Sequence, residues 1–184
     1  MKNLFRSRFT VALLPAFCMG IFGGCGAAKG VSVGDPAPEV SLTDYTGEDV
    51  SPALYRGEKV VVLYFYPKDD TPGCTTQACT FRDSYEAFTN AGAVVIGVSG
   101  DSAESHESFA DAYKLPFHLA VDADGSARKA FGVGKTMGVL PGRVTFVIDK
   151  AGIIRHIFSS QTQPKKHVDE ARCIVTELSE KDEE

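Results

Sequence analysis

The sequence predicts an α/β fold in which a central mixed β-sheet is flanked by helices. Three observations predict it: two continuous apolar runs, a helical segment between them, and two short apolar segments that flank a turn. Strands that alternate with helices are typical of α/β folds. The chain has 184 residues, of which 43% are hydrophobic, and is therefore long enough for one domain with a sizeable core.

The two apolar runs are predicted to be buried strands. Residues 60–66 read VVVLYFY and residues 93–99 read AVVIGVS. Because neither run alternates apolar with polar residues, each is expected to be covered on both faces, with 60–66 as the central strand. Residues 145–148 and 153–158 flank the turn residues 149–152, and this pattern predicts a hairpin.

Three segments are predicted to be helices. Residues 74–90 contain no glycine or proline and repeat apolar side chains at intervals of three and four. Residues 102–114 and 164–178 are the second and third predicted helices. The sequence shows no internal repeat and no second domain boundary, so residues 30–184 are expected to form one domain.

Charge and cysteine content exclude some functions. The formal net charge is -5, no run of Lys and Arg exceeds two, and residues 180–184 are mainly acidic, which argues against nucleic-acid binding. Five cysteines are too few for a disulfide scaffold at this length, and they do not fall at zinc-finger spacings. The role of each cysteine therefore decides the function.

Residues 1–29 resemble a removable export signal. Three basic residues precede an apolar run, 9–22, which is shorter than the roughly 20 residues that a membrane-spanning helix needs. Residues 21–25 also resemble a bacterial lipoprotein box, in which Cys25 would carry the lipid, although Cys25 could equally be discarded with the signal. The expected location is the periplasm or the thylakoid lumen, with or without a lipid anchor, and otherwise the plastid or cytoplasm.

Cys74 is the candidate nucleophile, because it opens a predicted helix directly after the predicted central strand. Unpaired backbone N–H groups and the helix dipole favour an anion at this position, so they favour the thiolate. A helix terminus supplies at most about 2 kcal/mol, which is too little to hold the thiolate at neutral pH without another positive group. Arg143 is the candidate for that group, because it lies between a turn and a predicted strand.

Cys79 follows Cys74 by five positions. On an intact helix this spacing places the two Cα atoms about 8.6 Å apart, whereas a disulfide tolerates at most about 7 Å. The two cysteines can bond only if the first turns of the helix unwind. The spacing therefore indicates a switch between a reduced helical state and an oxidised, locally unfolded state.

Competing motifs fail on spacing. A plant-type iron–sulfur pattern beginning at Cys74 would need its next ligand at Arg82, and the cysteine pair is not a C-x-x-C motif. Residues 134–136 have the tail of a phosphate-binding loop, but Lys129 occupies the position of its first glycine. The four histidines form no cluster, and each is expected to be a surface or packing residue: His106, His118, His156 and His167.

With these residues in view, the chain resembles the peroxiredoxins, and within them the atypical two-cysteine group called peroxiredoxin Q or bacterioferritin comigratory protein. The resemblance covers residues 31–179, and residues 161–170 are especially similar to plant and cyanobacterial members. It rests on Gly34-Asp35-x-Ala37-Pro38, residues 62–67, Pro67-x3-Thr71-x2-Cys74, Cys79, Gly97-Val98-Ser99 with Ser105-His106, Leu115-Pro116-Phe117, and residues 141–149.

The resemblance implies a thioredoxin-like fold and a role for each matched residue. Cys74 would be the peroxidatic cysteine and Cys79 the resolving cysteine, and the two would form an intramolecular disulfide. Pro67 would shield the pocket, Thr71 would hold the thiolate and peroxide through its hydroxyl, and Arg143 would stabilise negative charge. Cys173 is not part of the resemblance.

The implied activity is reduction of hydrogen peroxide and organic hydroperoxides, with thioredoxin or a thioredoxin-like protein as reductant. No metal or organic cofactor is implied, and a monomer is expected. Two other functions remain open on the sequence: a redox sensor that changes partners on oxidation, and an exported dithiol oxidoreductase.

Overall fold

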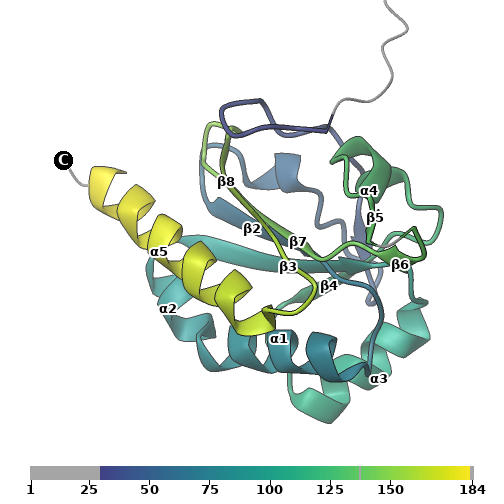
Figure 1. Ribbon diagram of the computed structural model, residues 1–184. Helices are drawn as coiled ribbons and strands as arrows, with labels where there is room; N and C mark the ends of the chain where they lie inside the picture. The colour runs from purple at the N-terminus through teal and green to yellow at the C-terminus, as the bar shows by residue number, and fades with distance from the viewer. Residues whose placement is uncertain (1–29, 137, 183–184) are drawn as a thin grey trace, which may run out of the picture.

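The computed structural model describes residues 30–136 and 138–182. A six-stranded sheet has the order β1-β4-β3-β2-β7-β8, with helices on both of its faces (Figure 1). β2 pairs parallel with β3 and antiparallel with β7, so the sheet is mixed, as predicted. The strands are β1 (Thr43–Asp44), β2 (Val60–Phe65), β3 (Ala93–Ser99), β4 (His118–Val121), β7 (Val144–Ile148) and β8 (Ile154–Ser159).

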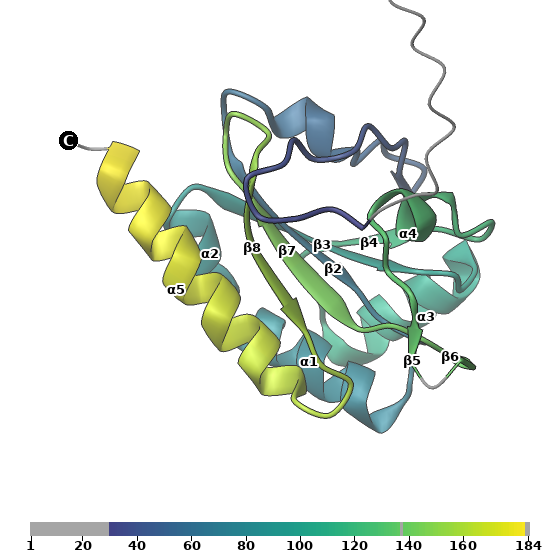
Figure 2. The same ribbon diagram turned by 45° about the horizontal axis from the view of Figure 1, so that its top comes forward.

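Successive side chains of β2 enter two different apolar clusters, which explains the unbroken apolar run. Val60, Val62 and Tyr64 face one cluster, and Val61 and Leu63 face the other. The first face is covered by α1 (Pro72–Asp83), α2 (Tyr85–Asn90), α3 (Ala103–Tyr113) and α5 (Pro164–Asp182). The second face is covered by residues 31–50, the 3-10 helix η1 (Pro52–Tyr55) and α4 (Ser126–Ala130), as Figure 2 shows from a second angle.

The single helix predicted over residues 74–90 is wrong in one respect, because Ser84 divides it into α1 and α2. Ser84 has φ -105° and ψ 3°, outside helical geometry. Its N–H is shared between the carbonyls of Thr80 and Phe81, both at 3.2 Å, a pattern common at helix ends. Serine is also a weak helix former in a helix interior. The break leaves both Phe81 and Phe88 fully buried.

The other predicted elements are confirmed, and several short ones were not predicted. β7 and β8 form the expected hairpin, and α5 continues four residues past the predicted end. The segment that resembled a phosphate-binding loop is instead β5 (Lys135–Thr136), which pairs with β6 (Leu140–Pro141). The remaining unpredicted elements are β1, η1, β4 and α4.

The first described residues lie against the turn after α4. A Cβ atom added to Gly132, whose φ is +67°, would lie 2.5 Å from the Cα atom of Gly30. Val31 packs against the second core cluster. The predicted signal segment and Cys25 lie outside the described residues. In the described part of the chain, no helix is both long and apolar enough to cross a membrane.

Candidate active site

Cys74 lies in the first turn of α1 and is 1% exposed. The helix begins at Pro72, after Thr71 in extended geometry, because proline suits a first helical position and disfavours helical geometry in the residue before it. Thr71 does not cap the helix with its side chain, since its hydroxyl donates to the Lys68 carbonyl at 3.0 Å. The thiol therefore lies at the positive end of α1, as predicted.

Arg143 reaches Cys74 from the turn that precedes β7. Its Nη2 donates to Cys74 Sγ at 3.3 Å, and its Nη1 donates to Gln77 Oε1 at 2.6 Å. β7 is the antiparallel neighbour of β2, and α1 follows β2, so sheet pairing brings together groups 69 positions apart in sequence. The predicted proximity of Arg143 and Cys74 is thus present in the structure.

The surroundings of Arg143 favour an anion at Cys74. The Arg143 side chain is buried, and within the described residues no carboxylate forms an ion pair with it. A buried cation is costly unless a negative charge lies near it. The ionised sulfur of Cys74 would supply that charge at 3.3 Å.

Two site residues, Gln77 and Gly73, were missed by the sequence analysis. Gln77 lies three residues after Cys74 on α1, so it shares a helix face with the sulfur, and this spacing was a usable signal. Gly73 leaves room for the guanidinium, because an added Cβ would lie 3.0 Å from Arg143 Nη2. Among the described residues, Gln77 Nε2 and Arg143 Nε are buried without a hydrogen-bond partner, so the site contains unsatisfied polar groups.

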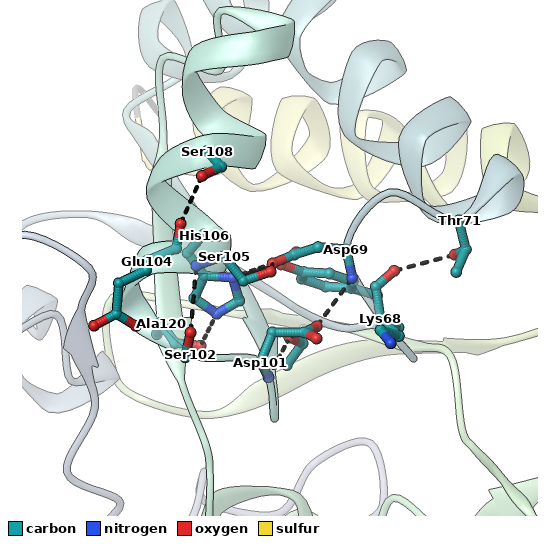
Figure 3. A network of polar contacts seen from close by, with 12 residues as sticks. Lys68, Asp69, Thr71, Asp101, Ser102, Glu104, Ser105, His106, Ser108 and Ala120 are labelled. Atoms are coloured by element: carbon teal, nitrogen blue, oxygen red, sulfur yellow. Dashed lines mark hydrogen bonds and ion pairs between the residues drawn. The ribbon is translucent and has the colours of Figure 1, made fainter.

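A buried polar network fixes the loop between β2 and α1 (Figure 3). Asp69 Oδ1 accepts from the Tyr66 hydroxyl at 2.7 Å, and Oδ2 contacts His106 Nδ1 and accepts from Ser105 Oγ, both at 2.8 Å. The Asp69 N–H donates to Asp101 at 2.9 Å. Burial raises the pKa of Asp69, but the hydrogen bonds, led by His106, outweigh it and leave this pKa below its usual value. The loop is thereby tied to α3.

Pro67 and Thr71 lie at the two ends of this loop. Pro67 is half-buried and follows the last residues of β2, while Thr71 precedes α1. The hydrogen bond to Lys68 uses the single hydroxyl proton of Thr71, so its oxygen keeps only acceptor capacity in this conformation. The roles predicted for Pro67 and Thr71 stay predictions.

Cys79 lies on α1 and is partly exposed, and both Cys74 and Cys79 are free thiols. α1 is continuous between them, so the structure corresponds to the reduced, helical state of the predicted switch. Cys173 is exposed on α5, with its Sγ 3.7 Å from a carboxylate oxygen of Glu177.

His167 lies on α5, close enough to Arg143 to feel its charge. It is fully buried, its Nδ1 contacts Thr145 Oγ1 at 2.8 Å, and its Nε2 lies 2.8 Å from the Ser160 carbonyl. A carbonyl only accepts, so Nε2 carries the proton and Nδ1 accepts from the threonine hydroxyl. Burial is the main cause that lowers the pKa of His167 to about 4, and the charge of Arg143 lowers it further. His167 is therefore neutral at pH 7.

The remaining histidines each have their own polar partner. His118 contacts Asp44 at 2.9 Å, and His156 contacts Glu170 at 2.8 Å. Asp44, Glu48 and His118 lie close enough to share a cation, but Asp44 Oδ1 already accepts from the N–H groups of Thr46 and Glu48 and from the Thr46 hydroxyl. These hydrogen bonds stabilise the turn that follows Asp44 and account for its Oδ1 without a cation.

The AhpC/TSA family model matches residues 33–157. The chain belongs to this family of peroxiredoxins. A chloroplastic peroxiredoxin Q of Sedum lineare is 50% identical to this peroxiredoxin over 149 residues, 80% of each chain. A solved peroxiredoxin Q variant from Xylella fastidiosa is 31% identical, with a TM-score of 0.74 over 81% of this chain and 98% of that chain.

A third relative is the bacterioferritin comigratory protein of Xanthomonas campestris, described by its title as having alkyl peroxide reduction activity. Its structure is 30% identical to this peroxiredoxin, with a TM-score of 0.70 over 76% of this chain and 92% of that chain. The predicted peroxiredoxin Q resemblance and the thioredoxin-like fold are therefore confirmed.

Proposed function

We propose that this peroxiredoxin reduces hydrogen peroxide and organic hydroperoxides through Cys74. The observation that carries the proposal is the buried Arg143 guanidinium, which lies 3.3 Å from a sulfur at the N-terminus of α1. Such an arrangement favours a thiolate, which is the nucleophilic form of cysteine. The alkyl peroxide reduction named for the Xanthomonas campestris relative supports the same substrate class.

In the first step, the Cys74 thiolate attacks the terminal peroxide oxygen and the O–O bond breaks. The sulfur becomes a sulfenic acid, and the leaving oxygen takes a proton to give water or an alcohol. Arg143 and the first amides of α1 stabilise the negative charge that develops on the departing oxygen. Thr71 orients the peroxide, and Pro67 limits access of water to the sulfur.

In the second step, Cys79 attacks the sulfenic sulfur, which releases water and forms the Cys74–Cys79 disulfide. The intact helix keeps the two Cα atoms about 8.6 Å apart, so the first turns of α1 unwind before the bond forms. An external dithiol protein of the thioredoxin type then reduces the disulfide. We propose that the protein acts as a monomer and needs no metal or organic cofactor.

Mass spectrometry of the full chain, with each thiol assigned by peptide mapping, tests this reaction. One equivalent of hydrogen peroxide is expected to remove the mass of two hydrogens from the wild-type protein, with the new bond joining Cys74 and Cys79. Cys79→Ser should instead gain one oxygen on Cys74, and Cys74→Ser should be unchanged at Cys79. Cys173→Ser serves as the control that keeps the wild-type result.

Two outcomes would contradict the reaction scheme. Oxidation that begins on Cys79 in the Cys74→Ser protein would remove Cys74 as the nucleophile. A disulfide that joins Cys74 to Cys173, or to a second copy of the chain, would remove Cys79 as the resolving residue.

We propose further that residues 1–29 are a targeting segment and that residues 30–184 are the functional domain. Relatives such as that of Sedum lineare are chloroplastic, which supports a plastid destination. The bacterial-type alternatives are export to the periplasm and lipidation at Cys25. Mass spectrometry of the mature N-terminus separates them: a diacylated Cys25, a cut before residue 30 and an intact Met1 each indicate a different destination, and a cut beyond residue 31 would contradict the proposed boundary.

A further inference from the structure

We infer that Arg128 is a positioning residue for the peroxide step, because its guanidinium joins the two loops that carry the reacting groups. The inference rests on the proposed function. Arg128 belongs to α4, on the face of the sheet opposite to Cys74. It therefore acts on the site from behind, through backbone contacts.

The two contacts of Arg128 end on carbonyls beside the reacting groups. Nη2 donates to the Tyr66 carbonyl and Nη1 donates to the Gly142 carbonyl, both at 2.9 Å. Tyr66 directly precedes Pro67, and Gly142 directly precedes Arg143. One rigid, planar group thus sets the separation between the loop that leads to Cys74 and the turn that carries Arg143.

The β2–β7 pairing cannot set this separation by itself. The last paired residues of the ladder are Phe65 and Val144. In the same register, Tyr66 would come next and lie opposite Arg143, and Pro67 would follow and lie opposite Gly142. Pro67 has no N–H and cannot donate to a further rung. Arg128 supplies donors at the position where the ladder ends.

α4 is held firmly enough to act as a fixed support. Asp122 accepts from the N–H groups of Ala127 and Arg128 at 2.9 and 3.0 Å, which caps the start of the helix. Ala127 is fully buried, and the Arg128 guanidinium lies over the Phe65 ring, 5.5 Å from its centroid. The side chain is therefore oriented before substrate arrives, which is what precise placement of a site requires.

The consequence of losing Arg128 follows from the short distance at the site. Arg143 touches Cys74 through one donor at 3.3 Å, and a displacement of about 1 Å in a reacting group can cost up to about 100-fold in rate. A freed Gly142 turn would allow such a displacement. We expect loss of Arg128 to slow the reaction of the Cys74 thiolate with peroxide more than it slows alkylation of the same thiolate.

The test compares Arg128→Met with Lys129→Met, its exposed neighbour on α4, each in the full chain with Cys79→Ser to isolate the first step. Two rate constants at Cys74 are measured as a function of pH, so that each refers to the thiolate form: oxidation by hydrogen peroxide and alkylation by iodoacetamide. Arg128→Met should slow oxidation about ten-fold or more, while alkylation changes less than about two-fold. Lys129→Met should change neither rate.

Arg128→Lys keeps the charge but offers a single ammonium in place of two fixed donors, so it should also slow oxidation more than alkylation. If Arg128→Met does not fold, the rates of Arg128→Lys test the positioning role of Arg128. Equal losses in both rates, or unchanged oxidation, would overturn the positioning role. Failure of the parent protein to react with peroxide would instead overturn the proposed function.

Discussion

Arg143→Met is expected to lower the rate constant for oxidation of Cys74 by hydrogen peroxide by about 10²–10³-fold. Arg143 is the only positive side chain found against the sulfur in the described residues, and its Nη2 lies 3.3 Å from Sγ. The substitution removes the charge that faces both the thiolate and the departing oxygen. Stopped-flow or rapid-quench measurement of the first oxidation event checks it.

Arg143→Lys should recover only part of this loss. The guanidinium contacts Gln77 Oε1 and Cys74 Sγ with separate nitrogens, at 2.6 and 3.3 Å. A single ammonium cannot reproduce both contacts in one fixed plane. Its charge is retained, however, so its rate should lie between those of Arg143→Met and the wild type.

Arg155→Met is the matched control for loss of an arginine. Arg155 is exposed on β8 and pairs with Asp149 at 2.6 Å, away from the groups that surround Cys74. Its oxidation rate should equal that of the wild type. An Arg143→Met rate within about two-fold of the wild type would show that the helix terminus alone activates the sulfur.

The free energy of unfolding is expected to fall by about 3 kcal/mol between pH 7 and pH 4 because of His167. The pKa of the buried imidazole is about 4, compared with 6.5 in an exposed histidine. Between these values, the unfolded chain binds a proton that the folded protein does not. The contribution is therefore fully present above pH 6.5 and is lost as the pH falls toward 4.

Urea unfolding at several pH values measures this dependence. His167→Gln is the informative variant, because an amide can still donate to the Ser160 carbonyl and accept from Thr145 without titrating. Its stability should vary much less between pH 7 and pH 4 than that of the wild type. The carboxylates of Asp44 and Asp69, whose pKa values lie below the usual value, lose their contribution at lower pH. An equal pH dependence in wild type and His167→Gln would contradict the assignment.

The parts predicted well from sequence are those with a strong local signal. Unbroken apolar runs predict the strands at 60–66 and 93–99, and each strand is buried on both faces. Cys74 and Arg143 are far apart in sequence. Their contact could still be predicted, because Cys74 lies at a predicted helix start and Arg143 directly precedes a predicted strand.

Most of the missed parts depend on pairing partners that the local pattern of residues does not reveal. β5 and β6 have two residues each and exist only because they pair with one another. Arg128 belongs to a helix of five residues, too short for a periodic signal, and its function depends on two carbonyls 62 and 14 positions away. The partners of Asp69 at positions 105 and 106 could not be assigned from sequence for the same reason.

The close approach of Gly30 to Gly132 limits how far the proposed N-terminal cleavage can extend into this chain. The two backbones touch so closely that even a methyl group at Gly132 would collide with Gly30, and the partly buried Val31 packs against the second core cluster. A processing protease that removed these residues would expose the turn after α4 and uncover apolar surface. The fold itself therefore sets a downstream limit for the proposed removal of residues 1–29, whichever of the proposed destinations applies.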